Sequence, residues 1–380
     1  MSGIKRDKVV FESLGVEAQL SVYFSKDGAE EYDVMLRLSD VSGNFLSQLS
    51  GIANARESLL KDLLSSAQNN LHCVSQRCFL SDIANQQELV REYLGEDVGM
   101  VQQSPLDGSK IALWMLIVRG SDFVRQGQNV LLQKGGCKHI WSMGLCAGSG
   151  DSFAQTRDII SEYESYLQSM GGAMEPNCMR TWLYVRDIDN NYAGMVRSRR
   201  ELFESYGMNS HTHYIASTGI EGKPWMKSAL VQMDAYSIVG EADKMPQIQY
   251  LYGREVMNPT SEYGVTFERG VKLQYSDYSQ IFISGTASIN NKGEVVHVGD
   301  VQQQCCRAIH NIETLLAEAG STLSDVMYMI VYLRDIADYS SVKAEFDKIA
   351  GGSIPSVYVL APVCRPEWLV EMECVAIIPR

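Results

Sequence analysis

The last apolar run of the chain carries two glutamates that could do acid–base chemistry. In VEMEC, Glu371 and Glu373 alternate with Val370 and Met372. Side chains two positions apart point to the same face of a β-strand, so the two carboxyl groups would share a face. Carboxyl groups held close together disfavour each other's ionised form, which raises the pKa of at least one of them. The pattern predicts either such a catalytic pair or two solvent-exposed acids on an edge strand.

Arginines in three other segments could bind the carboxylates of a small anionic ligand. Arg365 lies on the loop that leads into the strand with the two glutamates. Arg199 follows Tyr192 by seven residues, which is two turns of a helix and places both on one face. Arg334 precedes a predicted helix. A guanidinium can clamp a carboxylate with two parallel hydrogen bonds, and a surface ion pair is the alternative for each of these arginines.

Small residues end one predicted strand and would let a ligand approach the backbone. Ser284, Gly285 and Thr286 follow an apolar run, and their N–H groups could face a ligand because glycine has no side chain. A β-bulge is the alternative interpretation. Two further candidate substrate-binding residues are Cys364, in the loop before the last strand, and Tyr358, in the apolar run before that loop.

The sequence predicts no metal and no cofactor. His211 and His213 share one face of a predicted strand, but a third ligand is not evident. The nine cysteines have neither zinc spacing nor a disulfide framework. The segment GSGDSF, residues 148–153, resembles a phosphate loop only loosely, and Asp151 or Ser152 is better explained as the cap of a helix.

Composition restricts the partners. The net charge of −13 argues against nucleic acid, which needs a basic surface, and leaves room for a small anionic metabolite bound by a few local cations. The start of the chain has no apolar segment typical of a signal peptide. No run approaches the roughly 18 apolar residues of a membrane span. We therefore expect a cytoplasmic protein that binds neither nucleic acid nor membranes.

Three segments with nearly the same sequence predict the architecture. FLSDIANQQ begins at Phe79, YVRDIDNNY at Tyr184 and YLRDIADYS at Tyr332. Each follows an apolar, β-rich run and leads into a short helix, and a longer amphipathic helix comes before each run. Such self-similarity predicts repeated modules of about a hundred residues. The modules are expected at residues 1–125, 126–242 and 243–380.

Each module is predicted to contain two strands, a helix, a strand, a helix and two strands, which is an α+β fold. The first helix is expected near residues 54–66. Because helices cover only one face of a sheet, the other face must be buried against another sheet. Three modules could bury these faces against one another in a pseudo-trimeric, barrel-like core with the helices outside.

The repeats differ at the positions of the two glutamates. The first repeat has Ala112 and Trp114 there, and the second has Gln232 and Asp234. Only the third repeat keeps both acids. We therefore expect at most one functional site, built by the third repeat together with a neighbouring repeat.

Four motifs of the third repeat resemble the Rid superfamily, also called YjgF or L-PSP. They are SGTASI, GEVVHVGDVQQQ, LLAEAGSTLSDVMYMIVYLRDIADY and LVEMECVAI. Simple Rid proteins are one module long and form trimers with small-molecule sites between subunits. The resemblance implies that this chain is similar to such a trimer fused into one polypeptide, present as a monomer or a low-order homo-oligomer.

A narrower resemblance connects the chain with the chorismatase branch of that superfamily. It rests on RTWLYVRDIDNNY with Arg199 downstream, on ASTGIEG, on FERG, and on VCRPEWLVEME. The resemblance implies hydrolysis of an enolpyruvyl ether with release of pyruvate and no cofactor. Glu371 matches the glutamate that acts in these sites and would be the general acid beside Glu373. Arg365 and Arg199 would neutralise the substrate's carboxylates.

Two other functions stay open. The first is a Rid-type enamine or imine deaminase or a related hydrolase, although Val357 stands where Rid deaminases have a substrate-binding arginine. The second is a non-catalytic protein that binds a small ligand, because two of the three repeats have lost their acids.

Overall fold

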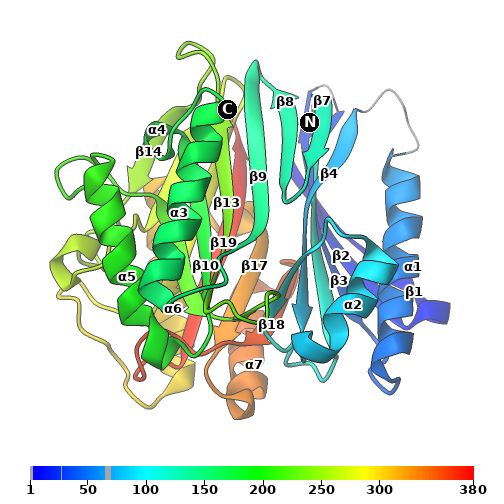
Figure 1. The fold of residues 1–380 in the computed structure, drawn as a ribbon. Helices are drawn as coiled ribbons and strands as arrows, with labels where there is room; N and C mark the ends of the chain where they lie inside the picture. Colours follow the sequence, from blue (N-terminus) through cyan, green and yellow to red (C-terminus); the bar gives the residue numbers. More distant parts are fainter. Residues whose placement is uncertain (1–2, 27, 65–69) are drawn as a thin grey trace.

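The computed structural model describes residues 3–26, 28–64 and 70–380, and its described strands form three sheets with helices on the outside (Figure 1). The α+β class predicted from the sequence is confirmed. The elements fall into three successive units, which we call the first, second and third modules. We call the contact between two modules a seam.

The first module comprises β1 (Gly3–Phe11), β2 (Val16–Ser25), β3 (Gly28–Leu38), α1 (Phe45–Leu64), β4 (Leu71–Leu80), α2 (Ile83–Leu94), β5 (Gly99–Gln102) and β6 (Ile111–Arg119). The second comprises β7 (Ser121–Gln126), β8 (Asn129–Lys134), β9 (Cys137–Cys146), α3 (Ser152–Ser169), α4 (Met174–Asn177), β10 (Cys178–Val185), α5 (Ile188–Ser205), β11 (Ala216–Glu221), β12 (Lys223–Pro224) and β13 (Val231–Val239). The third comprises β14 (Gln247–Leu251), β15 (Gly270–Gln274), β16 (Tyr278–Ala287), α6 (Val301–Glu318), β17 (Val326–Leu333), α7 (Tyr339–Ala350), β18 (Ser356–Leu360) and β19 (Val370–Pro379). Short 3₁₀ helices are η1 (Glu12–Leu14), η2 (Thr260–Tyr263), η3 (Leu323–Asp325) and η4 (Ile336–Asp338).

The same strand order recurs in every sheet. The third sheet runs β14-β15-β16-β19-β17-β18, the first begins β1-β2-β3-β6-β4-β5, and the second, read from its other edge, is β7-β8-β9-β13-β10-β11. In each sheet the strand after the second helix is parallel to its neighbour and the other pairs are antiparallel. Each module opens on three strands, one more than the sequence indicated.

The modules meet one another in a cycle. β12 of the second module pairs with β5 of the first. Ala216 forms a single bridge with Glu268 between the second and third modules, and Pro105 forms one with Val359 between the first and third. The described strands thus give three separate sheets linked at their edges, rather than one continuous closed barrel.

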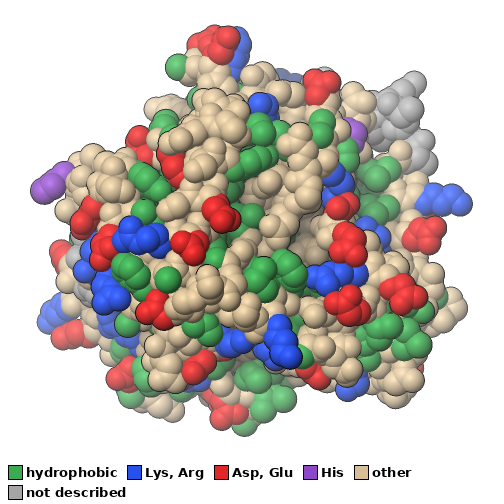
Figure 2. Space-filling model, in the orientation of Figure 1, with side chains coloured by type: hydrophobic (Ala, Val, Ile, Leu, Met, Phe, Trp, Pro, Cys, Tyr) green, Lys and Arg blue, Asp and Glu red, His purple; other side chains and the backbone are tan. Residues whose placement is uncertain are grey.

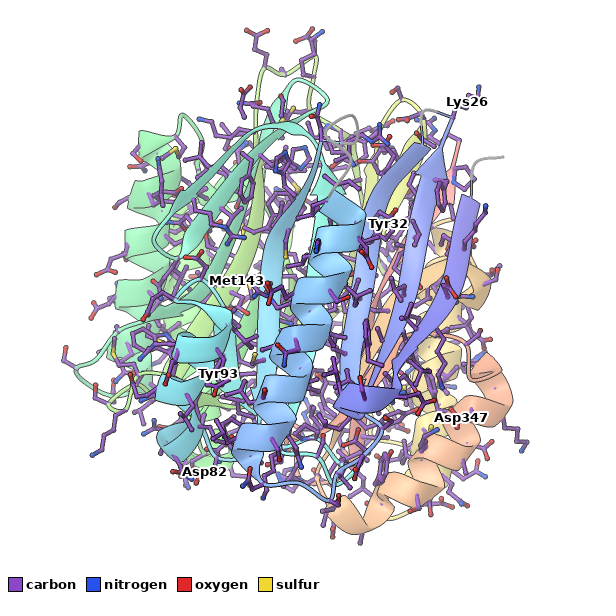
Figure 3. The ribbon with its side chains drawn as sticks, turned by 90° about the vertical axis from the view of Figure 1, so that its right-hand side faces the viewer. Lys26, Tyr32, Asp82, Tyr93, Met143 and Asp347 are labelled. Carbon is purple, nitrogen blue, oxygen red and sulfur yellow. The ribbon has the colours of Figure 1, made fainter. Side chains whose placement is uncertain are left out.

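Alternation along the strands assigns one face of each sheet to the helices and the other to a shared interior. On β6, Ile111 and Leu113 join the apolar cluster under α1, whereas Trp114 and Leu116 join a cluster that spans all three modules. Figure 3 shows α1 lying over the strands of the first module. Each of these fully buried side chains stabilises the fold by about 1.5–3 kcal/mol relative to an exposed position. The seams are therefore continuous with the core of the molecule.

Two local predictions were wrong. The helix α1 begins at Phe45 rather than near residue 54, and the side chain of Asn44 accepts a hydrogen bond from Ser47 N at 3.0 Å in its first turn. His211 and His213 do not lie on a strand, because β11 begins only at Ala216. Asn209 holds the preceding segment in a turn by accepting a hydrogen bond from His211 N.

Surface chemistry is mixed on the face that Figure 2 shows, where acidic and basic side chains are interspersed over the helices and strands. Within the described part of the chain, every helix is too short or too polar to cross a bilayer.

Candidate active site

A cavity of about 470 Å³ lies at the seam between the second and third modules. The second module contributes α5 and β11, and the third contributes β16, β19 and the loop before β19. Six of the residues predicted from the sequence line this cavity. They are Tyr192, Arg199, Gly285, Cys364, Arg365 and Glu371.

Glu371 is the acidic group of the cavity. Its side chain is on β19 and is 6% exposed. The pKa of Glu371 is raised to about 8, first by burial and then by the negative charge of Glu373, while Arg180 and Arg269 act in the opposite direction. Among the described residues, no hydrogen-bond partner of this carboxyl group is found. Glu371 is therefore suited to carry a proton near neutral pH and give it to a ligand.

Glu373 has a different environment, although it lies on the same face of β19. Its Oε1 accepts a hydrogen bond from Trp182 Nε1 at 2.7 Å, and its Oε2 accepts one from Arg180 Nη2 at 2.8 Å. The hydroxyl of Thr218 donates a further hydrogen bond to Oε2. Glu373 is not among the residues that line the cavity. It acts on Glu371 by its charge rather than by contact with a ligand.

Arginines dominate the charge of the cavity. Arg199, which is 2% exposed, donates from Nε to Thr266 Oγ1 at 3.1 Å. Arg365 lies over the ring of Trp368, with 4.8 Å between the guanidinium carbon and the ring centroid. Three further arginines line the cavity and were not predicted from the sequence. They are Arg197, Arg200 and Arg269. Because Glu371 is the one acid among the described lining residues, the cavity is electrostatically suited to an anion.

Gly285 brings the backbone of β16 against the acid. A Cβ atom at this position would lie 2.1 Å from Glu371 Oε1, so any side chain here would displace the carboxyl group. The pairing of β16 with β19 changes register between Ile283 and Thr286, so the β-bulge considered from the sequence is present. Ser284 and Thr286 do not line the cavity but hold the bulge, since each hydroxyl donates to a backbone carbonyl within 2.8 Å.

Two predicted substrate-binding residues lie elsewhere. Arg334 forms an ion pair with Asp189, at 2.5 Å. Tyr358 packs its ring against Tyr339 and Phe346, with centroid separations of 5.5 and 6.0 Å. Neither lines the cavity. The geometry gives both a packing role, and we remove them from the candidate ligand contacts.

Tyr192 and Cys364 also line the cavity, and both interact electrostatically with Glu371. Burial raises the pKa of Cys364 to about 12, and the charge of Glu371 contributes to the same shift. The thiol therefore stays protonated and offers no nucleophile at neutral pH.

Sequence reasoning missed the residues of the second module that hold Glu373. Arg180 and Trp182 lie in the RTW motif and Thr218 in ASTGIEG, both of which were noticed as segments without a role for each residue. Their partner lies far along the chain, so spacing gave no signal. Within residues 3–26, 28–64 and 70–380, no cluster of three or more His, Cys, Asp or Glu side chains could hold a metal ion.

Comparisons with known proteins agree with these observations. The family described as Endoribonuclease L-PSP matches residues 270–378. A RutC family protein of Pyrococcus abyssi is 37% identical over 98 residues, which are 25% of this chain and 76% of the relative. The 3-aminoacrylate deaminase RutC of Acinetobacter baylyi is 31% identical over 97 residues, which are 25% of this chain and 77% of the relative.

A solved structure resembles most of the chain. The crystal structure of a chorismatase superposes with a TM-score of 0.61 at 18% sequence identity, covering 80% of this chain and 92% of that one. The likeness shows a chorismatase-like fold. Because relatives at 31% and 37% identity are covered over three quarters of their length, the chain belongs to the RutC family, the Rid/YjgF/L-PSP proteins.

Proposed function

We propose that the protein hydrolyses an enolpyruvyl ether of a small dianion, such as chorismate, and releases pyruvate. The observation that carries the proposal is the buried carboxyl of Glu371, whose pKa is raised to about 8 in a cavity lined by five arginines. A protonated acid beside cationic groups is the arrangement needed to protonate carbon in an anionic substrate. The chorismatase-like fold supports the same reaction.

Glu371 would give its proton to the methylene carbon of the enol ether, using the electron pair of the carbon–carbon double bond. The carbon that bears the ether oxygen then becomes an oxocarbenium ion. Water adds to that carbon and returns a proton to Glu371. The resulting hemiketal collapses to pyruvate and the ring alcohol. General-acid help of this kind is worth about 10²–10⁴-fold in rate.

The arginines would hold the two carboxylates of the substrate. Arg199 comes from α5 and Arg365 from the loop before β19, so the two cations approach the cavity from different modules. Arg269 lies close enough to Glu371 to influence its pKa and would sit near the enolpyruvyl end. Apolar side chains such as Val196, Phe267 and Trp368 would pack against the ring.

A second candidate function is deamination of an enamine or imine. It is favoured by the 31% identity to an enzyme named 3-aminoacrylate deaminase. Protonation of an enamine carbon would use the same acid. Val357 lies on β18 and is fully buried, so it offers no cation where Rid deaminases have their arginine.

The purified protein incubated with chorismate tests the proposal, with pyruvate measured by the oxidation of NADH in the presence of lactate dehydrogenase. We expect pyruvate from wild type and none above background from Glu371→Gln. Ammonium released from an aminoacrylate, with no pyruvate from chorismate, would support the deaminase instead. Binding of either compound, with turnover of neither, would indicate a ligand-binding protein.

The proposed site depends on the arrangement of the modules. We propose module boundaries near residues 120 and 242, the first moved from the expected 125 because β7 (Ser121–Gln126) pairs with β8 in the second sheet. The three modules would take the places of three subunits around a barrel-like core. A small anionic metabolite would be the partner, and neither nucleic acid nor a membrane is needed. A mass from light scattering equal to one chain, or to a small multiple of it, would separate a monomeric pseudo-trimer from a low-order homo-oligomer.

A further inference from the structure

We infer that Thr218 is a positioning residue that keeps Glu373 ionised and thereby keeps the proton of the acid pair on Glu371. The inference rests on the proposed function, because it explains how the general acid retains its proton. Thr218 belongs to β11 of the second module, whereas both glutamates belong to β19 of the third. The second module would thus set the protonation state of an acid in its neighbour.

The hydroxyl of Thr218 has its proton direction fixed by its partners. Its oxygen accepts a hydrogen bond from Arg180 Nη2 at 2.6 Å and another from Gly285 N at 2.9 Å. A guanidinium and a backbone N–H can only donate, so both lone pairs of the hydroxyl are in use. The single hydroxyl proton must then point to its third partner, Glu373.

Glu373 receives only donors. Trp182 Nε1 occupies one oxygen, and Arg180 and Thr218 occupy the other. None of these groups can accept a proton from a carboxylic acid while keeping these contacts. The hydrogen-bond directions therefore require Glu373 to be a carboxylate. Glu371 is next to it on the same face and has no such set of donors, so a proton shared by the pair belongs on Glu371.

Thr218 also fixes the surface against which Glu371 rests. The hydrogen bond to Gly285 N holds the bulge of β16, and Gly285 is the residue whose Cβ, if present, would lie 2.1 Å from Glu371 Oε1. The γ-methyl of Thr218 lies 3.1 Å from the position that a Cβ of Gly285 would take. The Thr218 side chain thus contacts both the carboxylate of Glu373 and the backbone of Gly285.

Charged and titratable groups from several elements surround Glu371. Glu373 on β19, Arg180 on β10 and Arg269 before β15 act on its pKa. Tyr192 on α5 and Cys364 before β19 interact with its charge, and Arg199 on α5 and Arg365 before β19 line the same cavity. Thr218 differs from all of them because its side chain does not titrate. Its replacement changes the hydrogen bonds of Glu373 without adding or removing a charge.

The experiment is a ¹³C NMR titration of glutamate side-chain carboxyl carbons, which needs no substrate. Signals are assigned by their loss in Glu371→Gln and Glu373→Gln. In wild type we expect the Glu371 signal to titrate in one step near pH 8, while the three donors around Glu373 keep its signal from moving with that of Glu371. In Thr218→Val, which keeps the shape but loses the hydroxyl, both signals should move together because the proton is shared.

Thr218→Ser keeps the hydroxyl and is the matched control, in which the wild-type titration should return. With an enolpyruvyl substrate, kcat of Thr218→Val should fall about tenfold with KM within about twofold, because the acid is protonated in a smaller fraction of molecules. An unchanged Glu371 titration in folded Thr218→Val would overturn the inference. If Thr218→Val does not fold, the titration of the wild-type protein is the test. Joint titration of the Glu371 and Glu373 signals in wild type would also overturn the inference. Absence of pyruvate release would count against the proposed reaction alone.

Discussion

The seam between the first and second modules contains a cavity of about 460 Å³, almost the volume of the one between the second and third. The strand pairing makes the two equivalent: Gln232 opposite Tyr184 corresponds to Glu371 opposite Tyr332. Gly144 likewise takes the place of Gly285. The two cavities have similar volumes, but Glu371 lines the second–third cavity, whereas Gln232 is not among the described residues that line the first–second cavity.

In the first–second seam, both polar atoms of the Gln232 side chain form hydrogen bonds. Gln232 Nε2 donates to Met100 O at 3.0 Å, and its Oε1 accepts from Trp225 N at 3.2 Å. The indole of Trp225 donates to Gly144 O at 2.8 Å and covers the glycine. In the second–third seam, Glu371 has no corresponding partners among the described residues. Cavity volume therefore does not distinguish the two seams. They differ in Glu371, a carboxyl group without a hydrogen-bond partner among the residues that the structure describes.

The position two residues further along the strand carries an acid in both seams. It is Asp234 in the first–second seam and Glu373 in the second–third seam. Asp234 binds Arg77 across the first–second seam at 2.9 Å, as Glu373 binds Arg180 across the second–third seam at 2.8 Å. All four side chains are almost completely buried. Breaking such a pair leaves an uncompensated charge in the interior, which is costly. The shared geometry indicates that this position joins modules, whereas our proposal gives the position of Glu371 the role of general acid.

We expect the largest loss of activity from Glu371→Gln. This substitution gives the second–third seam the glutamine that the first–second seam has at the equivalent position, Gln232. The amide can form hydrogen bonds but cannot protonate carbon, so kcat should fall by about 10³-fold, or roughly 4 kcal/mol, with little change in KM. Steady-state kinetics on an enolpyruvyl ether measures this. A kcat close to that of wild type would remove Glu371 from the role of general acid.

Substitution of the two equivalent glycines should give opposite outcomes. Gly285→Ala places a methyl group where the Glu371 carboxyl lies, so activity should fall about 100-fold by displacement of the acid. Gly144 has a φ of +73°, so Gly144→Ala should cost about 1–2 kcal/mol of stability and leave activity intact. Activity assays and urea unfolding of both variants are the measurements. Equal activity losses would mean that the two seams are not functionally distinct.

Two arginines that stack on tryptophan provide a matched pair. Arg365 lies 4.8 Å from the ring of Trp368 at one seam, and Arg91 lies 5.0 Å from the ring of Trp225 at the other. Arg365→Ala should raise KM about 10–100-fold by removing a charge-assisted hydrogen bond to the substrate. Arg91→Ala should leave KM unchanged. The same rise in KM for both would indicate a nonspecific effect of lost stacking.

The smallest effect concerns stability and pH. The pKa of Glu371 is raised in the folded state, from 4.5 to about 8. Its contribution to stability is therefore present below the unfolded pKa and is lost as pH rises towards the folded one. Gln232 does not titrate and contributes nothing of this kind.

Glu371→Gln should accordingly gain stability relative to wild type by about 1.4 kcal/mol per pH unit between pH 5 and 7. Gln232→Ala, which removes a neutral side chain, should show no pH dependence in its difference from wild type. Urea unfolding at several pH values measures both. A constant difference between Glu371→Gln and wild type would mean that the pKa of Glu371 is not raised.

The sequence predicted the repeated fold because each module carries the same order of apolar runs and the same RDI-like segment after its central strand. It also predicted the shared face of Glu371 and Glu373, since a period of two residues is a local property of a strand. It missed the start of α1, where Gly51 interrupts the helical pattern. That glycine is explained by the backbone of Leu14, which a Cβ would approach to 2.7 Å.

The parts of the site that could not be predicted are contacts between modules. Thr218 and Arg180 reach Glu373 across a seam, and nothing in their own surroundings in the sequence indicates a buried acid. Arg334 and Tyr358 were expected in the site because of their sequence neighbourhood. The turn after β17 directs Arg334 to Asp189. The ring of Tyr358 packs against Tyr339 and Phe346, and its backbone carbonyl accepts a hydrogen bond from Leu106 N of the first module at 2.9 Å.

The cyclic arrangement of three modules in one chain has an evolutionary consequence. In a homotrimer, a single substitution appears at three seams at once, so an acid cannot be lost from one site and kept in another. In this chain each seam is encoded separately, and a glutamine at position 232 leaves the glutamate at position 371 untouched. Under the proposed function, selection for chemistry would act on the second–third seam, and the other two seams could change towards tighter packing without loss of activity.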